Sequence, residues 1–337
     1  MSKTIRPPNS NTSEVGVVGL GLMGSSIAAA FLMRGYKVIA VGPLEQDLIT
    51  APGLIRHALH ESLRKGIHDR DVMELESNIV FTRDYADLSN CFLISECVIE
   101  NIEVKKKVYG LIEQAVSDTA IISTNTSAIP ITILQKMVAH PNRFLGMHWA
   151  EPAFTTPFLE IICGPDTDVN IAEKLFKLAS EWGKEPTLLR KDIRGFITNR
   201  LMYAMYREGF NLVENGFASI EDVDRACRND GGRWMAFCGL FRYMDITGLQ
   251  AYYHVMKDLF PTLSNQSQTP QLIEKIANEG GNGITNGNGF YKYSKAEAAE
   301  WTKAFEEFSY DLNLLMQKYP SNHVEQRLTG KEISNPI

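Results

Sequence analysis

Short apolar runs alternate with amphipathic stretches through the first half of the chain. Residues 15–18 form an apolar, largely β-branched run that is typical of a buried parallel strand. A glycine-rich loop follows, and small residues from Ser25 to Arg34 then predict a helix that ends at Gly35. Residues 37–41 predict a second strand. This order of strand, loop, helix and strand makes one β-α-β unit.

The same alternation continues to about residue 190. Helices are predicted over 44–65, 69–76, 104–116 and 170–182, and strands over 78–81, 93–99, 120–123, 144–148 and 158–163. Strands that alternate with helices favour a doubly wound parallel sheet, so we expect an α/β, Rossmann-type domain over residues 15–191. Residues 1–14 are polar and include two adjacent prolines, and we expect a loose tail there.

After Gly195 the apolar positions recur three and four residues apart, which is the spacing of helices. Helices are predicted over 196–214, 220–227, 249–260, 271–279 and 296–317, and no strand is predicted. We therefore expect an all-α C-terminal domain over residues 192–330.

Charge and cysteine content exclude several classes of partner. The formal net charge is −6, and no block of lysine and arginine is present, so we expect no nucleic-acid partner. The five cysteines are irregularly spaced and contain no C-x-x-C pair, so we expect neither a disulfide framework nor a metal site. Their use favours a reducing, cytoplasmic location. No apolar run reaches about 18 residues, so no membrane span is expected.

The glycine-rich loop reads Gly19-Leu20-Gly21-Leu22-Met23-Gly24. It follows a strand and opens a helix, which is the context in which G-x-G-x-x-G binds a dinucleotide. The first glycine permits the turn, the second lets the backbone approach a pyrophosphate, and the third lets helix and strand pack closely. The alternative is a tight turn with no ligand. We predict that this loop binds a nicotinamide dinucleotide, NAD in the first instance.

One expected part of that motif is missing. The second strand should end in an acid that binds the adenosine ribose, but Gly42 and Pro43 stand there. Glu45 lies three residues further on, behind a turn that Pro43 stiffens. Because no acid discriminates against a 2′-phosphate, NADP is not excluded.

A histidine and a carboxylate form the second candidate cluster. His148 ends a predicted strand, where open α/β sheets bind their ligands, and Glu160 lies inside the apolar run 158–163. A buried carboxylate needs a polar partner, and pairing with His148 would supply one. The pair would leave the second imidazole nitrogen free for proton transfer. A purely structural histidine is the alternative.

Several motifs in a specific order give the chain a family resemblance. They are the loop 19–24, Val98-Ile99-Glu100-Asn101-Ile102-Glu103-Val104-Lys105, Asn125-Thr126-Ser127, His148 with Glu160, residues 195–200 (Gly-Phe-Ile-Thr-Asn-Arg) and residues 289–293 (Gly-Phe-Tyr-Lys-Tyr). Over residues 15–295 the sequence resembles the L-3-hydroxyacyl-CoA dehydrogenases, enzymes of fatty acid metabolism. The resemblance implies a homodimer formed through the helical domain.

The resemblance also implies residue roles. His148 would be the general acid/base on a 3-hydroxyl group, and Glu160 would orient it. Ser127 and Asn199 would bind the substrate oxygen, although either could instead serve a helix end. Ser127, Glu100 and Lys105 would also contact the nicotinamide half of the cofactor. Ser62 would contact CoA, although its surroundings are typical of a solvated helix.

The chain departs from this family at several positions. Glu151 replaces an asparagine that faces the nicotinamide, and a carboxylate has no hydrogen to donate. Asp69 stands where a CoA-contacting lysine is expected, and Ile284-Thr285 replaces a lysine pair. Residues 231–239 look more like dehydrogenases of L-gulonate and L-carnitine. There Arg233 could bind a substrate carboxylate, with a surface ion pair as its alternative.

Three hypotheses follow. The leading one is an NAD-dependent L-3-hydroxyacyl-CoA dehydrogenase. The second is a dehydrogenase of a small, free 3-hydroxy acid, in which Arg233 binds the carboxylate. The third is a cofactor-binding protein of low activity, as crystallin relatives suggest; intact Ser127, His148, Glu160 and Asn199 argue against it.

Overall fold

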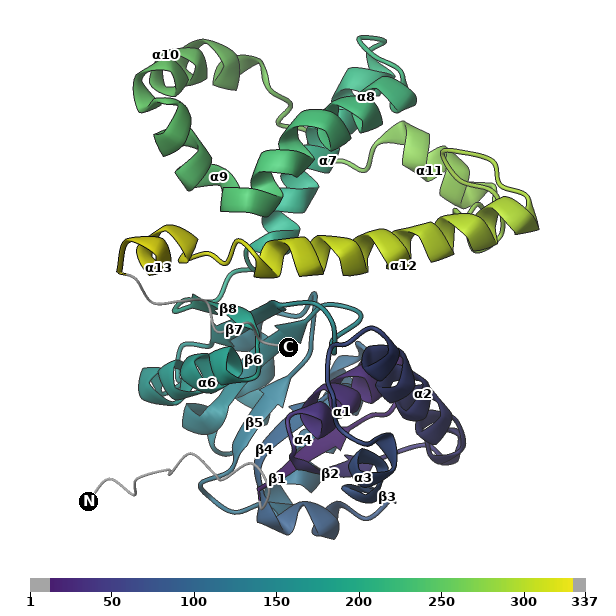
Figure 1. Ribbon diagram of the computed structural model, residues 1–337, viewed down its shortest axis with the longest axis vertical. Helices are drawn as coiled ribbons and strands as arrows, with labels where there is room; N and C mark the ends of the chain where they lie inside the picture. Colours follow the sequence, from purple (N-terminus) through teal and green to yellow (C-terminus); the bar gives the residue numbers. More distant parts are fainter. Residues whose placement is uncertain (1–12, 330–337) are drawn as a thin grey trace. The chain divides into compact units, whose positions relative to one another are not determined.

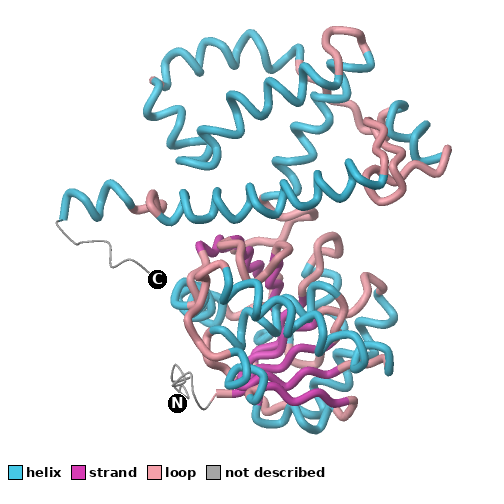
Figure 2. Tube along the Cα trace, turned by 45° about the vertical axis from the view of Figure 1, so that its right-hand side comes forward, coloured by secondary structure: helices cyan, strands magenta, loops and turns pink. Residues whose placement is uncertain are grey.

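The computed structural model describes residues 13–329 and divides the chain into two compact units, with the boundary between Asn199 and Arg200. The first unit carries a sheet with helices on both faces (Figure 1), and the second is helical (Figure 2). Most of the predicted tail lies outside the described residues, and Glu14 already belongs to the first strand. The predicted combination of a Rossmann-type domain with a helical domain is confirmed.

The first unit is built on one sheet of eight strands in the order β3-β2-β1-β4-β5-β6-β7-β8. The strands are β1 (Glu14–Val18), β2 (Lys37–Val41), β3 (Ile79–Thr82), β4 (Cys91–Glu96), β5 (Ile121–Thr124), β6 (Phe144–Trp149), β7 (Phe158–Cys163) and β8 (Glu185–Leu189). From β1 the sheet grows outwards through β2 to β3, and β4 then pairs with the other side of β1. The carboxyl ends of the parallel strands β1 and β4 therefore lie side by side. Ligands of open α/β sheets bind at such a switch point.

Two sequence-based expectations for the sheet were wrong. The pair β6 and β7 is antiparallel, because only residues 150–157 join the strands and a parallel crossover needs a dozen or more residues. The edge strand β8 was not predicted, because Glu185-Pro186-Thr187 interrupts its apolar pattern. In addition, β4 ends at Glu96 and not at residue 99, so the segment 97–101 leaves the sheet.

Helices cover both faces of this sheet. They are α1 (Leu22–Met33), α2 (Glu45–Arg64), α3 (Val72–Ser77), α4 (Ile102–Ala115), α5 (Ile131–Leu134) and α6 (Val169–Glu181). One core lies between the sheet and α1, α2, α3 and α6, and the other lies beneath α4 and α5. Strand β2 shows the alternation that produces two cores, because Val38 and Ala40 face the first and Ile39 and Val41 face the second.

Helix α1 has no polar face, since every residue from Gly24 to Met33 is buried. Its small side chains let it lie against the centre of the sheet, beside the strand that precedes it. Gly35 follows with a φ of 83°, a conformation that glycine adopts without strain, and this ends the helix as the sequence predicts.

The helical part contains α7 (Thr198–Glu214), α8 (Ile220–Ala226), α9 (Gly232–Thr247), α10 (Leu249–Leu259), α11 (Gln271–Asn278), α12 (Lys295–Gln317) and α13 (His323–Thr329). Helices α9 and α13 were not predicted. The sequence of α9 lacks a polar face, and Gly239 interrupts its helical backbone with a φ of 69°. Between residues 200 and 329 the only β pairing consists of isolated bridges around Asn288. No helix within 13–329 is long and apolar enough to cross a membrane.

Candidate active site

The glycine loop between β1 and α1 forms a cradle, and a different steric constraint requires glycine at each of its three glycine positions. Gly19 has a φ of 93°, and its N–H donates to the carbonyl of Val41 at 2.9 Å. A Cβ on Gly24 would lie 1.8 Å from the carbonyl oxygen of Gly19, whereas a Cβ on Gly21 would meet no protein atom within 4 Å. Gly21 therefore faces open space that a ligand can occupy.

The first turn of α1 completes this cradle. No side chain caps the helix, so its first N–H groups remain available to an anion. Leu20 is buried and anchors the loop, Leu22 is exposed, and Met23 packs partly against the core. These residues fit a dinucleotide pyrophosphate.

Gly42 occupies the position where the ribose-binding acid was expected. A Cβ there would lie 2.8 Å from the side chain of Leu48 and 3.0 Å from Cβ of Asp47, so the start of α2 restricts this position. Asp47 accepts a hydrogen bond from Leu44 N at 3.3 Å and belongs to the helix start. Glu45 is exposed at the beginning of α2.

A buried carboxylate that the sequence analysis missed lies at the end of β4. Glu96 is fully buried and accepts hydrogen bonds from Lys105 Nζ at 2.8 and 3.1 Å, Tyr109 Oη at 2.9 Å, Thr124 Oγ1 at 2.7 Å and Val98 N at 2.8 Å. The sequence signal was available, because Glu96 follows the apolar run 92–94, and a glutamate in an apolar run is the feature that identified Glu160.

Lys105 does not lie on the surface of the cradle. Its side chain is 1% exposed, and its ammonium is bound to Glu96 and lies 3.3 Å from Glu100 Oε2. Lys105 therefore binds two carboxylates, and its contact with the nicotinamide half of the cofactor stays a prediction. Lys105 neutralises Glu96 and holds Glu100.

Glu100 in turn holds the loop that carries Ser127. Its Oε1 accepts hydrogen bonds from the hydroxyl of Thr126 and from the amides of Ser127 and Ala128, both at 3.2 Å. Burial alone would raise the pKa of Glu100, but Thr126 and Lys105 lower it below its usual value, so the carboxylate stays ionised. An ionised Glu100 can accept from all these donors at once.

His148 joins Ser127 to Glu160. Its Nδ1 lies 2.8 Å from Glu160 Oε2, and its Nε2 lies 3.0 Å from Ser127 Oγ. The antiparallel register places His148 directly opposite Glu160, as their predicted pairing requires. Phe158 and Phe196 flank the imidazole, with ring centroids 5.6 Å away in both cases.

The second oxygen of Glu160 is also occupied. Oε1 accepts from the amides of Ile197 and Thr198, both at 3.0 Å. Burial alone would raise the pKa of Glu160, but the hydrogen bond from His148 and those from the two amides lower it. The ionised carboxylate favours a proton on Nδ1, which leaves the lone pair of Nε2 to accept a proton from a hydroxyl group.

Asn199 also belongs to this cluster. Its amide Nδ2 donates to the carbonyl of Ser127 at 3.2 Å. Asn125 contributes from the other side, because its Oδ1 accepts from Trp149 N at 2.9 Å. The loop after β5 is thereby tied both to the end of β6 and to the first turn of α7.

The remaining predicted residues lie in different surroundings. Ser62 is fully buried, and its hydroxyl has no hydrogen-bond partner within the described residues. Its predicted place on a solvated helix face is therefore wrong, and its contact with CoA stays a prediction. Asp69 is exposed. Arg233 is exposed at the start of α9 in the second unit.

Glu151 lies just after β6. Burial raises its pKa, and a hydrogen bond from Ser26 on α1 opposes the rise. Through Ser26, Glu151 contacts the first turns of α1, next to the glycine cradle.

The chain was compared with known proteins. Residues 14–193 match the NAD binding domain of 3-hydroxyacyl-CoA dehydrogenase, and residues 195–293 match its C-terminal domain. The chain belongs to the 3-hydroxyacyl-CoA dehydrogenase family. It is an NAD-dependent dehydrogenase that acts on a hydroxyl group.

Two family relatives differ in substrate. The chain is 32% identical over 298 residues to 5-formyl-3-hydroxy-2-methylpyridine 4-carboxylate 5-dehydrogenase of Mesorhizobium japonicum, which covers 87% of this chain and 93% of that protein. It is 30% identical over 279 residues to a protein of Deinococcus radiodurans named "Probable 3-hydroxybutyryl-CoA dehydrogenase", with 82% and 99% covered.

The solved structures that match include both a pyridine carboxylate dehydrogenase and a 3-hydroxybutyryl-CoA dehydrogenase. A crystal structure of the 5-formyl-3-hydroxy-2-methylpyridine 4-carboxylic acid 5-dehydrogenase, described as an NAD⁺-dependent dismutase, matches with a TM-score of 0.81 and 29% identity over 95% of this chain and 99% of that chain. The (S)-3-hydroxybutyryl-CoA dehydrogenase of Ralstonia eutropha matches with a TM-score of 0.70 and 28% identity, over 83% and 99%.

The two glycines of the cradle should respond differently to alanine. Gly21→Ala meets no protein atom, so we expect normal stability but NADH binding weakened by about tenfold or more, because the methyl group occupies ligand space. Gly24→Ala should lower both NADH affinity and, by about 1–3 kcal/mol, the free energy of unfolding. Fluorescence titration and urea denaturation measure the two effects. Gly110→Ala, an open position on α4, is the control; equal behaviour of Gly21→Ala and Gly110→Ala would contradict this assignment.

Removing one partner of the buried ion pair Glu96–Lys105 should destabilise the protein more than its share in the loss of both partners. Glu96→Gln or Lys105→Met alone should lower the free energy of unfolding by about 3–5 kcal/mol, because each leaves one buried charge unpaired. The double variant should lose less than the sum of the two. Urea denaturation provides the measurement. Glu61→Gln, which removes the partly exposed ion pair with Arg64, is the control and should change the free energy of unfolding by about 1 kcal/mol or less. Simple additivity would show that the pair is not coupled.

Proposed function

We propose that this enzyme oxidises the hydroxyl carbon of a small, free carboxylic acid, with His148 as general base. The observation that carries the proposal is the contact of Nε2 with Ser127 Oγ while Nδ1 is held by Glu160. A substrate hydroxyl beside Ser127 would give its proton to Nε2, and the imidazolium formed would be stabilised by the Glu160 carboxylate. When bound, the nicotinamide accepts the hydride from the same carbon.

The other residues of the cluster position these groups. Glu100 holds the Ser127 loop through backbone amides, and the Asn199 amide holds the Ser127 carbonyl. A side chain that is already placed does not lose conformational entropy in the transition state. In the reverse direction the protonated His148 returns its proton to the carbonyl oxygen as the hydride arrives.

The choice of a small acid depends on what the CoA-side positions offer. Ser62 is buried, and Asp69 presents an exposed negative charge where a CoA phosphate would need a positive one. The similarity to the pyridine carboxylate dehydrogenase structure extends over 95% of the chain, against 83% for the 3-hydroxybutyryl-CoA dehydrogenase. For the substrate carboxylate the sequence offers Arg233, whose guanidinium can bind it through two hydrogen bonds.

A 3-hydroxyacyl-CoA thioester is the second candidate substrate. It is supported by the family itself and by the relatives named for 3-hydroxybutyryl-CoA. A cofactor-binding protein of low activity is disfavoured by the contacts of His148, since a protein without turnover has no need for a histidine held on both nitrogens.

A panel of substrates tests the proposal. With NAD, we expect oxidation of at least one free acid among 3-hydroxybutyrate, L-gulonate, L-carnitine and a hydroxymethylpyridine carboxylate, and little reduction of acetoacetyl-CoA by NADH. His148→Gln should lower kcat by about 100-fold or more while NADH affinity is retained, because only proton transfer is lost. His140→Gln, at an exposed histidine, is the matched control. Turnover of the thioester alone would replace the first candidate by the second.

We also propose that the protein forms a homodimer through its second unit. None of the helices α7 to α13 has a buried residue, and α12 exposes Trp301, Phe305 and Phe308 by 61%, 70% and 63%. Their spacing of four and three residues puts them on one helix face. A helical domain needs an apolar core, and a second copy of the chain would bury this face.

Sedimentation equilibrium tests the assembly. We expect twice the mass of one chain for the wild type, and a shift towards the monomer for Phe305→Ser, because an apolar anchor is lost. Lys303→Ser, two residues away on the same helix, should leave the dimer intact. A monomeric wild type at micromolar concentration would overturn the proposal.

A further inference from the structure

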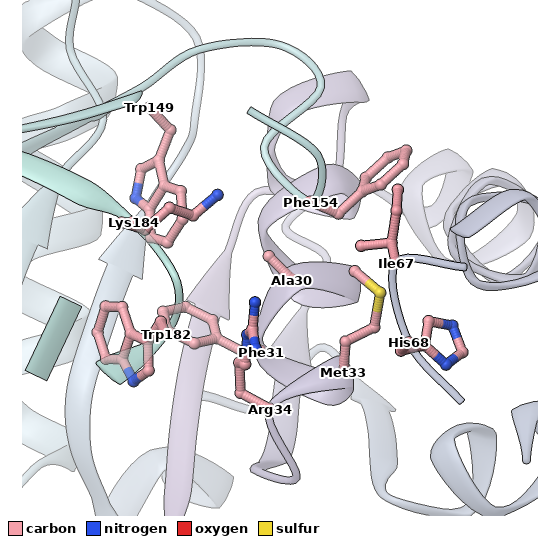
Figure 3. Close-up of a pocket in the computed structure, with 10 residues that line it drawn as sticks. All are labelled: Ala30, Phe31, Met33, Arg34, Ile67, His68, Trp149, Phe154, Trp182 and Lys184. Carbon is pink, nitrogen blue, oxygen red and sulfur yellow. The ribbon is translucent and has the colours of Figure 1, made fainter. Parts of the chain in front are cut away.

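The connection between β6 and β7 (residues 150–157) joins the strand of His148 to the strand of Glu160. Its backbone is bound by Lys184, which lies in the turn between α6 and β8. Figure 3 shows Lys184 beside Trp149, with Phe154 of the connection and Arg34, the residue after α1, lining the same pocket. No role in the proposed chemistry has so far involved this lysine.

Lys184 makes contacts that fix two points of the connection. Its Nζ donates to the carbonyl oxygens of Ala153 and Thr156, both at 2.5 Å, and lies 5.2 Å from the centroid of the Trp149 ring. The side chain is 8% exposed. Two charge-assisted hydrogen bonds from one buried group are strong restraints on a connection without regular secondary structure.

The same connection reaches the cofactor cradle. The amide of Ala153 donates to Ser26 Oγ at 2.7 Å, and the Ser26 hydroxyl bonds to Glu151. Ser26 lies on the first turns of α1, two residues after the last glycine of the cradle. Lys184, the 150–157 connection and the start of α1 therefore form one continuous set of contacts.

Among residues 13–329 the ammonium of Lys184 has no carboxylate partner. The other ionisable side chains that line the same pocket are Arg34, just after α1, and His68 in the loop between α2 and α3. Glu181 and Glu185, its neighbours along the chain, are exposed and make no ion pair with it. Burial, with repulsion from Arg34 second, lowers the pKa of Lys184 to about 7, while the two carbonyl oxygens favour the protonated form.

We propose that Lys184 is a positioning residue that holds the 150–157 connection against the start of α1 and thereby supports cofactor binding. The inference rests on the contacts of Ala153 and Glu151 with Ser26 of α1 and on the proposed role of the glycine cradle in cofactor binding, and not on the identity of the hydroxyl substrate. Loss of the proton from Lys184 removes the charge that binds the two carbonyls and relaxes the connection. Cofactor affinity should therefore fall as the pH rises through neutrality.

Binding of NADH, followed by fluorescence titration from pH 6 to 9, tests this without any hydroxyl substrate. In the wild type, Kd should increase several-fold as the pH rises from 6 to 9. Lys184→Met should bind about tenfold more weakly at pH 6 and show little dependence on pH, because it lacks the titrating group. Lys177→Met, an exposed lysine on α6, should behave as the wild type.

Arg34→Met provides a second, independent variant. Arg34 lies at the protein surface, so its replacement should be tolerated, and removal of its charge should move the pH at which NADH affinity falls to a higher value. Urea denaturation of each variant reports folding. Should Lys184→Met fail to fold, an unchanged pH profile in Arg34→Met would overturn the proposal.

Wild-type affinity and pH dependence in a folded Lys184→Met protein would also overturn it. Failure of the substrate panel would leave these results untouched, because NADH alone is the probe. The two proposals can therefore fail separately.

Discussion

The carboxylate of Glu160 is the group on which the arrangement of this site depends. One oxygen holds Nδ1 of His148, and the other holds the amides of Ile197 and Thr198 at the start of α7. A buried charge is stable only when all its hydrogen bonds are made, and here three segments of the chain must meet to make them. The antiparallel pairing of β6 with β7 helps to meet this requirement, because it places Glu160 directly opposite His148.

A second buried carboxylate plays the corresponding part on the neighbouring strands. Glu96 joins β4, β5 and α4 through its hydrogen bonds. The ammonium of its partner Lys105 also forms an ion pair with Glu100. Glu100 then fixes the Ser127 loop. Thus two buried anions, Glu96 at the end of β4 and Glu160 within β7, position the two sides of the hydroxyl-binding region, while the glycine cradle needs only backbone groups and space.

Much of the fold could be predicted from local pattern, and the errors have local causes. Ser62 belongs to the buried stripe that continues from Ala51, Ile55, Ala58 and Leu59, and Lys105 belongs to the stripe of Val108, Tyr109 and Ile112. In both helices a polar residue occupies a position on the buried, apolar face. A prediction from residue type alone places such a residue in solvent. Helix α9 escaped prediction because it has almost no polar face to give it a period.

The sequence by itself determined the glycine cradle, the family and the presence of an unusual carboxylate in an apolar strand, because each depends on residues close together in the chain. The tertiary structure decided which groups those residues meet. Thr124 binds Glu96 from 28 residues away, and Lys184 binds Ala153 from 31. Such contacts arise from the order of strands in the sheet. The connection 150–157 makes β7 run antiparallel to β6, and the hydrophobic pattern of the two strands does not reveal that direction.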